Sequence, residues 1–241
     1  MPPSVCYFVC ATPRSGSSFL CEVLSSTGVA GHPDDYFWNP PFWLAHWGLM
    51  DFPGFAERLL QEGTTANGIF GSKLMWDQLA ETCKQFARLI SLDEAGPANV
   101  LAAAFSNLHY VWLTRRDKVR QGTSYYRAME TKMWRSADVS KVGRVEPAFN
   151  FEAIQSLVQL CTWEDQAWQD YFRQNAIEPC TVVYEDLLES PAAVVRRVLS
   201  YLAVRPPDPL FREGAWRHQR QSDATSEEWV EWYKARVDAT Q

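Results

Sequence analysis

The chain has 241 residues, 46% of them hydrophobic, which is enough to bury one extended apolar core. We therefore expect a single domain that spans residues 1–241. Its 29 acidic and 23 basic residues give a formal net charge of -6, which argues against a bulk attraction to nucleic acid or to anionic lipid. Any anion that the protein binds must be held by a local cluster of donors.

Membrane and metal functions also lack support in the sequence. No stretch approaches the roughly 20 apolar residues of a membrane span, and the apolar run 5–11 lacks the basic flank of a signal peptide. We expect a cytoplasmic protein without an integral membrane segment. The six cysteines lie in apolar stretches without Cys-x-x-Cys spacing, so we expect reduced core thiols and no metal site.

Strand and helix patterns alternate along the chain. Short apolar runs predict strands, and apolar residues at helical spacing predict helices. In chain order the pattern predicts a strand at 5–11, a helix at 19–26, a short strand at 28–31, an irregular loop at 32–47, a helix at 55–61, a strand at 68–74, a helix at 77–90, a strand at 109–113, a helix from the Asp117 cap to about 133, a loop at 135–147, a helix at 151–172, a strand at 181–184, a helix at 191–202 and an amphipathic stretch at 226–236. This order predicts a three-layer α/β/α fold with a central parallel sheet.

The loop between the first strand and the first helix has the composition of a phosphate site. Residues 13–18 read Pro-Arg-Ser-Gly-Ser-Ser. Glycine lets backbone amides approach an anion, and the arginine and the hydroxyls add directed hydrogen bonds. The Gly-Lys-Ser/Thr ending of ATP- and GTP-binding loops is missing, which indicates a site without their magnesium machinery. An ordinary turn that contains serines is the alternative interpretation.

A second candidate anion contact follows a later strand. Arg115 ends the strand predicted at 109–113, and Ser124 lies nine positions on, in the next helix. Both side chains can reach one anionic group only if the chain turns sharply at 116–117. A solvated charge cluster is the alternative.

Together these segments resemble the two signatures of sulfotransferases. The stretches 27–31, 71–76, 131–135 and 227–231 are similar to the bacterial trehalose-sulfotransferase family, which includes rhizobial lipopolysaccharide sulfotransferases. The resemblance implies a P-loop NTPase-like sulfotransferase fold, the donor 3′-phosphoadenosine 5′-phosphosulfate, no metal and a homodimer.

The resemblance also assigns the donor site. It implies that Arg115 and Ser124 bind the 3′-phosphate and that Tyr184 lies near adenine. It further implies that Arg220, in the polar segment 205–241, closes over the nucleotide. The 5′-phosphosulfate is expected to be bound by the first loop, at Arg14, Ser15, Gly16, Ser17 and Ser18.

The acceptor base is implied in the same way. Trehalose enzymes carry it in a Gly-Glu-Pro-x-Glu-Phe-Phe pattern, and residues 31–37 here read Gly-His-Pro-Asp-Asp-Tyr-Phe. The matching carboxylate is Asp35, one methylene shorter than glutamate, so its backbone must come closer to the hydroxyl. His32 is a second candidate, because histidine titrates near neutral pH.

Further side chains are candidates for charge stabilisation and sugar contact. Arg14 is expected to stabilise the departing group, with Lys73 as the alternative cation that holds acceptor or donor oxygens. Trp76, and Trp38 or Trp43, are candidates for stacking on a sugar. The acceptor is expected to be trehalose or a sugar of a glycolipid or lipopolysaccharide. A nucleotide kinase or NTPase and a catalytically inactive nucleotide-binding module are the alternative functions.

Overall fold

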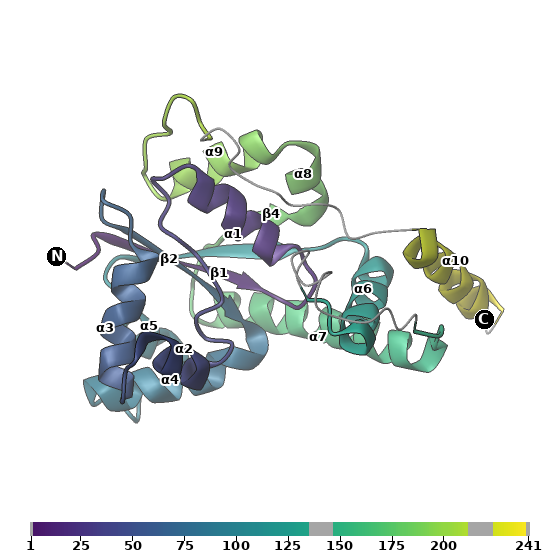
Figure 1. Cartoon of the computed structure of the whole chain (residues 1–241), viewed down its shortest axis with the longest axis horizontal. Coiled ribbons are helices and arrows are strands. Elements are labelled where there is room, and N and C mark those ends of the chain that lie inside the picture. The colour runs from purple at the N-terminus through teal and green to yellow at the C-terminus, as the bar shows by residue number, and fades with distance from the viewer. Residues whose placement is uncertain (1, 135–146, 212–223, 240–241) are drawn as a thin grey trace.

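The structure is a computed structural model, and it describes residues 2–134, 147–211 and 224–239. Within these ranges four parallel strands form one sheet in the order β2-β1-β3-β4 (Figure 1). Their bounds are β1 (Val5–Ala11), β2 (Ile69–Met75), β3 (Leu108–Thr114) and β4 (Cys180–Val183). β1 pairs with β2 from Val5↔Ile69 to Ala11↔Met75, and with β3 from Cys6↔Leu108 to Cys10↔Trp112. The predicted parallel sheet is confirmed.

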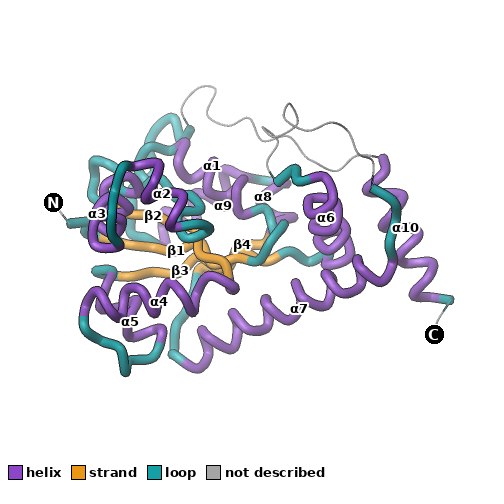
Figure 2. Tube along the Cα trace, turned by 60° about the horizontal axis from the view of Figure 1, so that its bottom comes forward, coloured by secondary structure: helices purple, strands orange, loops and turns teal. Residues whose placement is uncertain are grey.

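Helices cover both faces of this sheet. In chain order they are α1 (Ser17–Ser26), α2 (Pro40–Trp47), α3 (Phe52–Gly63), α4 (Trp76–Ile90), α5 (Pro97–Ala104), α6 (Lys118–Thr131), α7 (Phe151–Gln174), α8 (Tyr184–Glu189), α9 (Pro191–Tyr201) and α10 (Ala224–Asp238). Figure 2 shows α1, α8 and α9 on one side of the sheet and α4, α5 and α7 on the other. The three-layer arrangement is therefore confirmed.

Alternate residues of β1 supply the two halves of the core. Phe8 and Cys10 belong to the cluster that includes residues of α3, α4, α5 and α7. Tyr7 and Val9 face the opposite cluster, with residues of α1 and α9. Because both faces are covered, β1 reads as a continuous apolar run. All six cysteines are buried and carry free thiols, and burial raises the pKa of Cys6 to about 12.

Two predictions for the segment after α1 are wrong. Residues 28–31 are a bent segment and not a strand, because Gly28 and Gly31 have φ values of 70° and 72°, in the left-handed region that glycine tolerates. The stretch 32–47 is not wholly irregular, because α2 occupies its second half. Asn39 caps this helix by accepting a hydrogen bond from the Phe42 amide at 3.1 Å, and Pro40 begins its first turn, where proline is favoured.

Two helices, α5 and α8, were not predicted. α5 has two buried residues, Val100 and Leu101, and α8 has only Leu187. Neither segment therefore shows apolar residues repeating at helical spacing. α10 confirms the helical pattern at 226–236 and extends it to Asp238. None of the helices in the described ranges is long and apolar enough to cross a membrane.

Candidate functional site

The helices that follow the neighbouring strands β1 and β3 lead to opposite faces of the sheet. α1, which follows β1, covers one face of the sheet, whereas α7, which follows β3 and α6, covers the other. Adjacent strands whose helices diverge leave a crevice at their carboxyl ends, where ligands of open α/β sheets bind. The predicted residues follow these ends: the loop 12–16 follows β1, Arg115 follows β3 and Tyr184 follows β4, while Lys73 lies near the end of β2.

The loop after β1 has a left-handed backbone at two positions. Arg14 has a φ of 61° and Gly16 a φ of 94°. Gly16 is the N-cap of α1 and has no side chain to occupy the free amides of the first helical turn. A Cβ atom at Gly16 would lie 2.2 Å from the Tyr184 ring. The Ser15 Oγ atom is buried and has no hydrogen-bond partner among the described residues. The loop thus offers unpaired polar groups to a ligand.

The two arginines of the prediction meet at this loop. Arg14 Nε donates to Ser124 Oγ at 3.0 Å, and Arg115 Nη1 donates to the Arg14 carbonyl at 3.1 Å. Arg115 Cζ lies 4.6 Å from the centre of the Tyr184 ring. The sharp turn at 116–117 is present, because Asp117 caps α6. The structure therefore brings Arg14, Arg115, Ser124 and Tyr184 together.

The two guanidinium groups bring two positive charges to this loop in a half-buried setting. Burial and the neighbouring charge of Arg115 lower the pKa of Arg14 to about 10. Burial also lowers the pKa of Arg115, whose Nε atom lacks an acceptor among the described residues. A bound anion relieves both the repulsion and the missing hydrogen bond. The residues present fit a ligand that carries several negative charges.

A buried polar network that was not predicted holds the loop in place. Gln121 Nε2 donates to Thr12 Oγ1 and to the Pro13 carbonyl, each at 2.8 Å. Gln121 Oε1 accepts from Lys118 Nζ at 3.2 Å, and Lys118 pairs with the buried Asp165 of α7. A glutamine inside a helix gives no sequence signal of this kind, because its partners in the loop lie more than 100 positions away.

Asp35, the predicted base, is fixed beside the end of β2. Its Oδ2 atom lies 2.8 Å from Lys73 Nζ, and its Oδ1 atom accepts from Gln78 Nε2 at 3.2 Å. The Trp43 indole donates to the Asp35 carbonyl at 3.3 Å. The side chains of Lys73 and Asp35 are 5% and 17% exposed. The alternative base, His32, is exposed, so the structure joins Lys73 to Asp35 and not to His32.

The tryptophans named from the sequence differ in their surroundings. Trp76 begins α4, and its ring centre lies 5.1 Å from that of the buried Trp168 and 6.4 Å from that of Trp163. Trp43 packs on Trp47 at 5.0 Å, whereas Trp38 is 65% exposed. These contacts make Trp43 a support of the Asp35 loop. Arg220, predicted to close over the nucleotide, lies outside the described residues.

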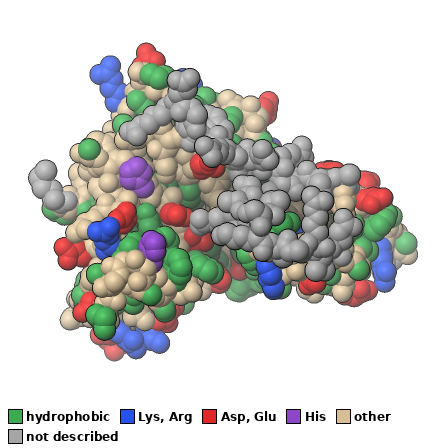
Figure 3. Space-filling model, viewed as in Figure 1, with side chains coloured by type: hydrophobic (Ala, Val, Ile, Leu, Met, Phe, Trp, Pro, Cys, Tyr) green, Lys and Arg blue, Asp and Glu red, His purple; other side chains and the backbone are tan. Residues whose placement is uncertain are grey.

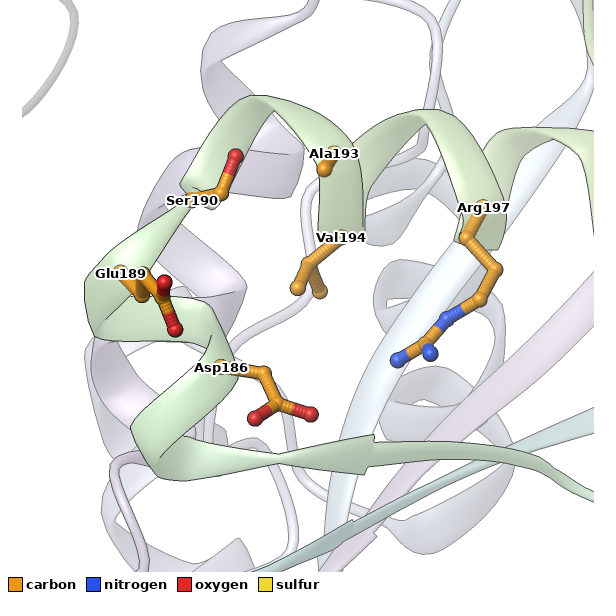
Figure 4. Close-up of a pocket in the computed structure, with 6 residues that line it drawn as sticks. All are labelled: Asp186, Glu189, Ser190, Ala193, Val194 and Arg197. Atoms are coloured by element: carbon orange, nitrogen blue, oxygen red, sulfur yellow. The ribbon is translucent and has the colours of Figure 1, made fainter.

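A separate hollow lies between α8 and α9 (Figure 4). It has a volume of about 280 Å³ and is lined by Asp186, Glu189, Ser190, Ala193, Val194 and Arg197. Arg197 donates to the Thr181 carbonyl of β4 at 2.9 Å, so this arginine anchors α9 to the sheet. None of the predicted site residues lines this hollow.

Comparison with known proteins identifies the family of this chain. The sequence profile of the Stf0 sulphotransferase family matches residues 6–236. A trehalose 2-sulfotransferase of Mycobacterium tuberculosis is 29% identical over 95% of this chain and 94% of its own length. A trehalose 2-sulfotransferase of Mycolicibacterium smegmatis is also 29% identical, with the same coverage.

Solved structures show the same fold. The sulfotransferase domain from the curacin biosynthetic pathway has a TM-score of 0.54 and 16% identity, over 93% of this chain and 82% of that domain. A sulfotransferase from Alicyclobacillus acidocaldarius has a TM-score of 0.51 and 15% identity, over 100% of this chain and 96% of its own. With the profile match over nearly its whole length, the chain belongs to the Stf0 sulphotransferase family, and it is a sulfotransferase of the trehalose-sulfotransferase-like kind.

Proposed function

We propose that this sulfotransferase takes its sulfuryl group from 3′-phosphoadenosine 5′-phosphosulfate and passes it to a carbohydrate hydroxyl. The observation that carries the proposal is the pair of half-buried guanidinium groups at the carboxyl ends of β1 and β3: Arg14 donates to Ser124 Oγ, and Arg115 donates to the Arg14 carbonyl. Two adjacent half-buried cations are costly unless an anion is bound between them. A donor with a phosphosulfate at one end and a phosphate at the other supplies such charges.

Each part of the donor has candidate partners in the chain. The loop residues Arg14, Ser15, Gly16, Ser17 and Ser18 hold the 5′-phosphosulfate with amides, hydroxyls and one guanidinium group. Arg115 and Ser124 hold the 3′-phosphate. Tyr184, which packs on Gly16 and under Arg115, lies beside the adenine ring.

The transfer step needs a base and a stabilised leaving group. The donor supplies a sulfur atom bonded to a phosphate oxygen, and this S–O bond breaks as the acceptor oxygen bonds to sulfur. Asp35 takes the hydroxyl proton, and Arg14 stabilises the negative charge that develops on the departing phosphate oxygen. Lys73 and Gln78 hold the Asp35 carboxylate in one orientation, so that it is positioned before the acceptor binds.

The acceptor is a sugar in this proposal, with trehalose as the first candidate because the two relatives are trehalose 2-sulfotransferases. Sugars of glycolipids or lipopolysaccharide are the other candidates. Trp76 contributes an aromatic edge to the acceptor side, and Lys73 a cation. We further propose a homodimer, which sedimentation at micromolar concentration tests.

The experiment separates donor binding from chemistry. Titration calorimetry compares adenosine 3′,5′-bisphosphate with ATP and Mg²⁺, and mass spectrometry follows sulfate transfer to trehalose and to a panel of other sugars. We expect binding of the bisphosphate alone, and transfer to at least one sugar. The Asp35→Asn variant should retain bisphosphate affinity and lose at least 100-fold in kcat, since a positioned base contributes about 10²–10⁴-fold. Preference for ATP refutes the donor, and normal turnover of Asp35→Asn refutes the base.

A further inference from the structure

One oxygen of a buried carboxyl group on α7 has no hydrogen-bond partner within the described part of the chain. Glu164 is 5% exposed, and no donor among the described residues reaches its Oε2 atom. Native proteins satisfy most buried polar atoms, because an unpaired one costs the full free energy of desolvation. The adjacent Asp165 also has an unpaired oxygen, Oδ1, but its Oδ2 atom accepts from Thr114 Oγ1 at 2.5 Å and pairs with Lys118, whereas no hydrogen bond or ion pair is recorded for Glu164 among the described residues. Glu164 therefore needs an explanation that packing alone does not give.

Glu164 interacts electrostatically with residues on both sides of the proposed site in the sequence. Burial and the charges of Asp77 and Asp165 raise the pKa of Glu164 to about 7. Burial and the charge of Asp35 raise the pKa of Asp77, at the start of α4. Burial and the charges of Glu164 and Asp77 raise the pKa of Tyr125 of α6, the residue next to Ser124. Glu164 is thus linked through Asp77 to the proposed base and through Tyr125 to the helix of the proposed donor contacts.

Aromatic side chains accompany the carboxyl groups. Trp76 precedes Asp77 on α4, and Trp163 precedes Glu164 on α7. Their ring centres are 6.4 Å apart at an interplanar angle of 84°, and Trp163 is 60% exposed. Figure 3 shows where acidic and hydrophobic side chains lie on one face of the molecule. Carboxyl groups beside indole rings suit a polyol ring, which has hydroxyl groups at its edge and apolar C–H groups on its faces.

We propose that Glu164 is an acceptor-binding residue that hydrogen-bonds a sugar hydroxyl other than the one that is sulfated, with Trp163 against the sugar ring. The inference rests on the proposed function and names a residue that selects its acceptor. A carboxylate accepts hydrogen bonds from hydroxyl groups, whereas a neutral carboxyl group also donates one. The acceptor then supplies the partner that Glu164 Oε2 lacks.

The test uses Glu164→Gln, which keeps the shape of the side chain and removes its charge. The matched control is Glu152→Gln on the same helix, because the Glu152 side chain is 73% exposed. With trehalose as the acceptor, we expect Glu164→Gln to raise the acceptor KM about 10- to 100-fold, the loss typical of a hydrogen bond to a charged group. Its kcat and its affinity for adenosine 3′,5′-bisphosphate should stay within about threefold of wild type. Glu152→Gln should change none of these values.

Two further measurements separate binding from a structural role. The acceptor KM of the wild type should change with pH around 7, and this dependence should disappear in Glu164→Gln. Deoxy analogues of trehalose should identify one hydroxyl whose removal weakens the wild type but not the variant. An unchanged KM in Glu164→Gln, or a joint fall of kcat and bisphosphate affinity, overturns the inference while the proposed function stands. If the wild type transfers sulfate to no sugar, the proposed function fails and this inference fails with it.

Discussion

The contact between Gly16 and Tyr184 gives the sharpest prediction for the donor loop. In Gly16→Ala the new Cβ atom would lie 2.2 Å from Tyr184 Cδ2 and 2.6 Å from Cε2. The backbone at this position has a φ of 94°, a conformation that L-residues with a side chain rarely adopt. The substitution therefore strains the backbone and also pushes the ring away from the loop.

The magnitude follows from these two effects. A residue with a Cβ atom in the left-handed region costs roughly 1–2 kcal/mol, and forcing a ring out of a packed position costs about 1–3 kcal/mol. We expect a total of about 2–5 kcal/mol. At 1.4 kcal/mol for each factor of ten, the affinity for adenosine 3′,5′-bisphosphate falls roughly 30- to 4,000-fold if the strain is released by deforming the loop.

Titration calorimetry and thermal unfolding measure this effect together. Gly48→Ala is the control, because Gly48 also has a left-handed φ, of 67°, but no heavy atom lies within 4 Å of its added Cβ. The control should lose roughly 1–2 kcal/mol of stability and none of its nucleotide affinity. Combining Gly16→Ala with Tyr184→Leu should reduce the steric part of the loss. If Gly16→Ala binds the bisphosphate within threefold of wild type at unchanged Tm, the reasoning about this contact is wrong.

Three other changes have expected outcomes. Gly122→Ala places a Cβ atom 2.6 Å from Val158 Cγ2 and 2.9 Å from its amide nitrogen, so crowding between α6 and α7 should cost about 1–3 kcal/mol in chemical denaturation; stability equal to wild type would contradict it. Gln121→Leu removes the hydrogen bonds to the loop at Thr12 and should cost about 1–3 kcal/mol, with weaker bisphosphate binding as the specific readout. Burial, with nearby acidic charges, raises the pKa of Glu164 from 4.5 to about 7, so between these values the native state keeps a proton that the unfolded chain has lost, and stability falls as the pH rises. The stability of Glu164→Gln relative to wild type should therefore increase from pH 5 to pH 8, on the order of 1–3 kcal/mol. If the Tm difference between variant and wild type is the same at pH 5 and pH 8, the raised pKa of Glu164 is refuted.

The sequence alone predicts the fold class and the loop that we propose binds the donor. A strand buried on both faces must be continuously apolar, so residues 5–11 predict a parallel sheet with helices on both sides. The order of strand, glycine-bearing loop and helix in 5–26 fixes a group of amides at one point. These signals are local, because each depends on residues within one turn or one strand, and the structure confirms the elements that carry them.

Other features depend on residues that are far apart in the chain. The meeting of Arg14 with Ser124 joins positions 110 apart, and the sequence indicates it only through resemblance to a family. Three other features have no signal in the neighbouring sequence. They are the hydrogen bond between Gln78 and Asp35, the support of the loop by Gln121 and the unpaired Glu164 Oε2 atom among the described residues. The sequence does not predict helix α2, because none of its residues is fully buried. Its apolar residues therefore do not follow the helical spacing that packing on a core imposes.

The physical reason for this division is the range of the interactions. Backbone preference and burial on a covered strand act on neighbouring residues and leave a pattern in the sequence. Charge, hydrogen bonding and steric contact act through space, and the order of the strands decides which side chains they join. The sequence thus determines a loop that can bind an anion. Only the tertiary structure places Arg115 and Tyr184 against that loop, because β3 and β4 lie beside β1 only after the sheet has formed.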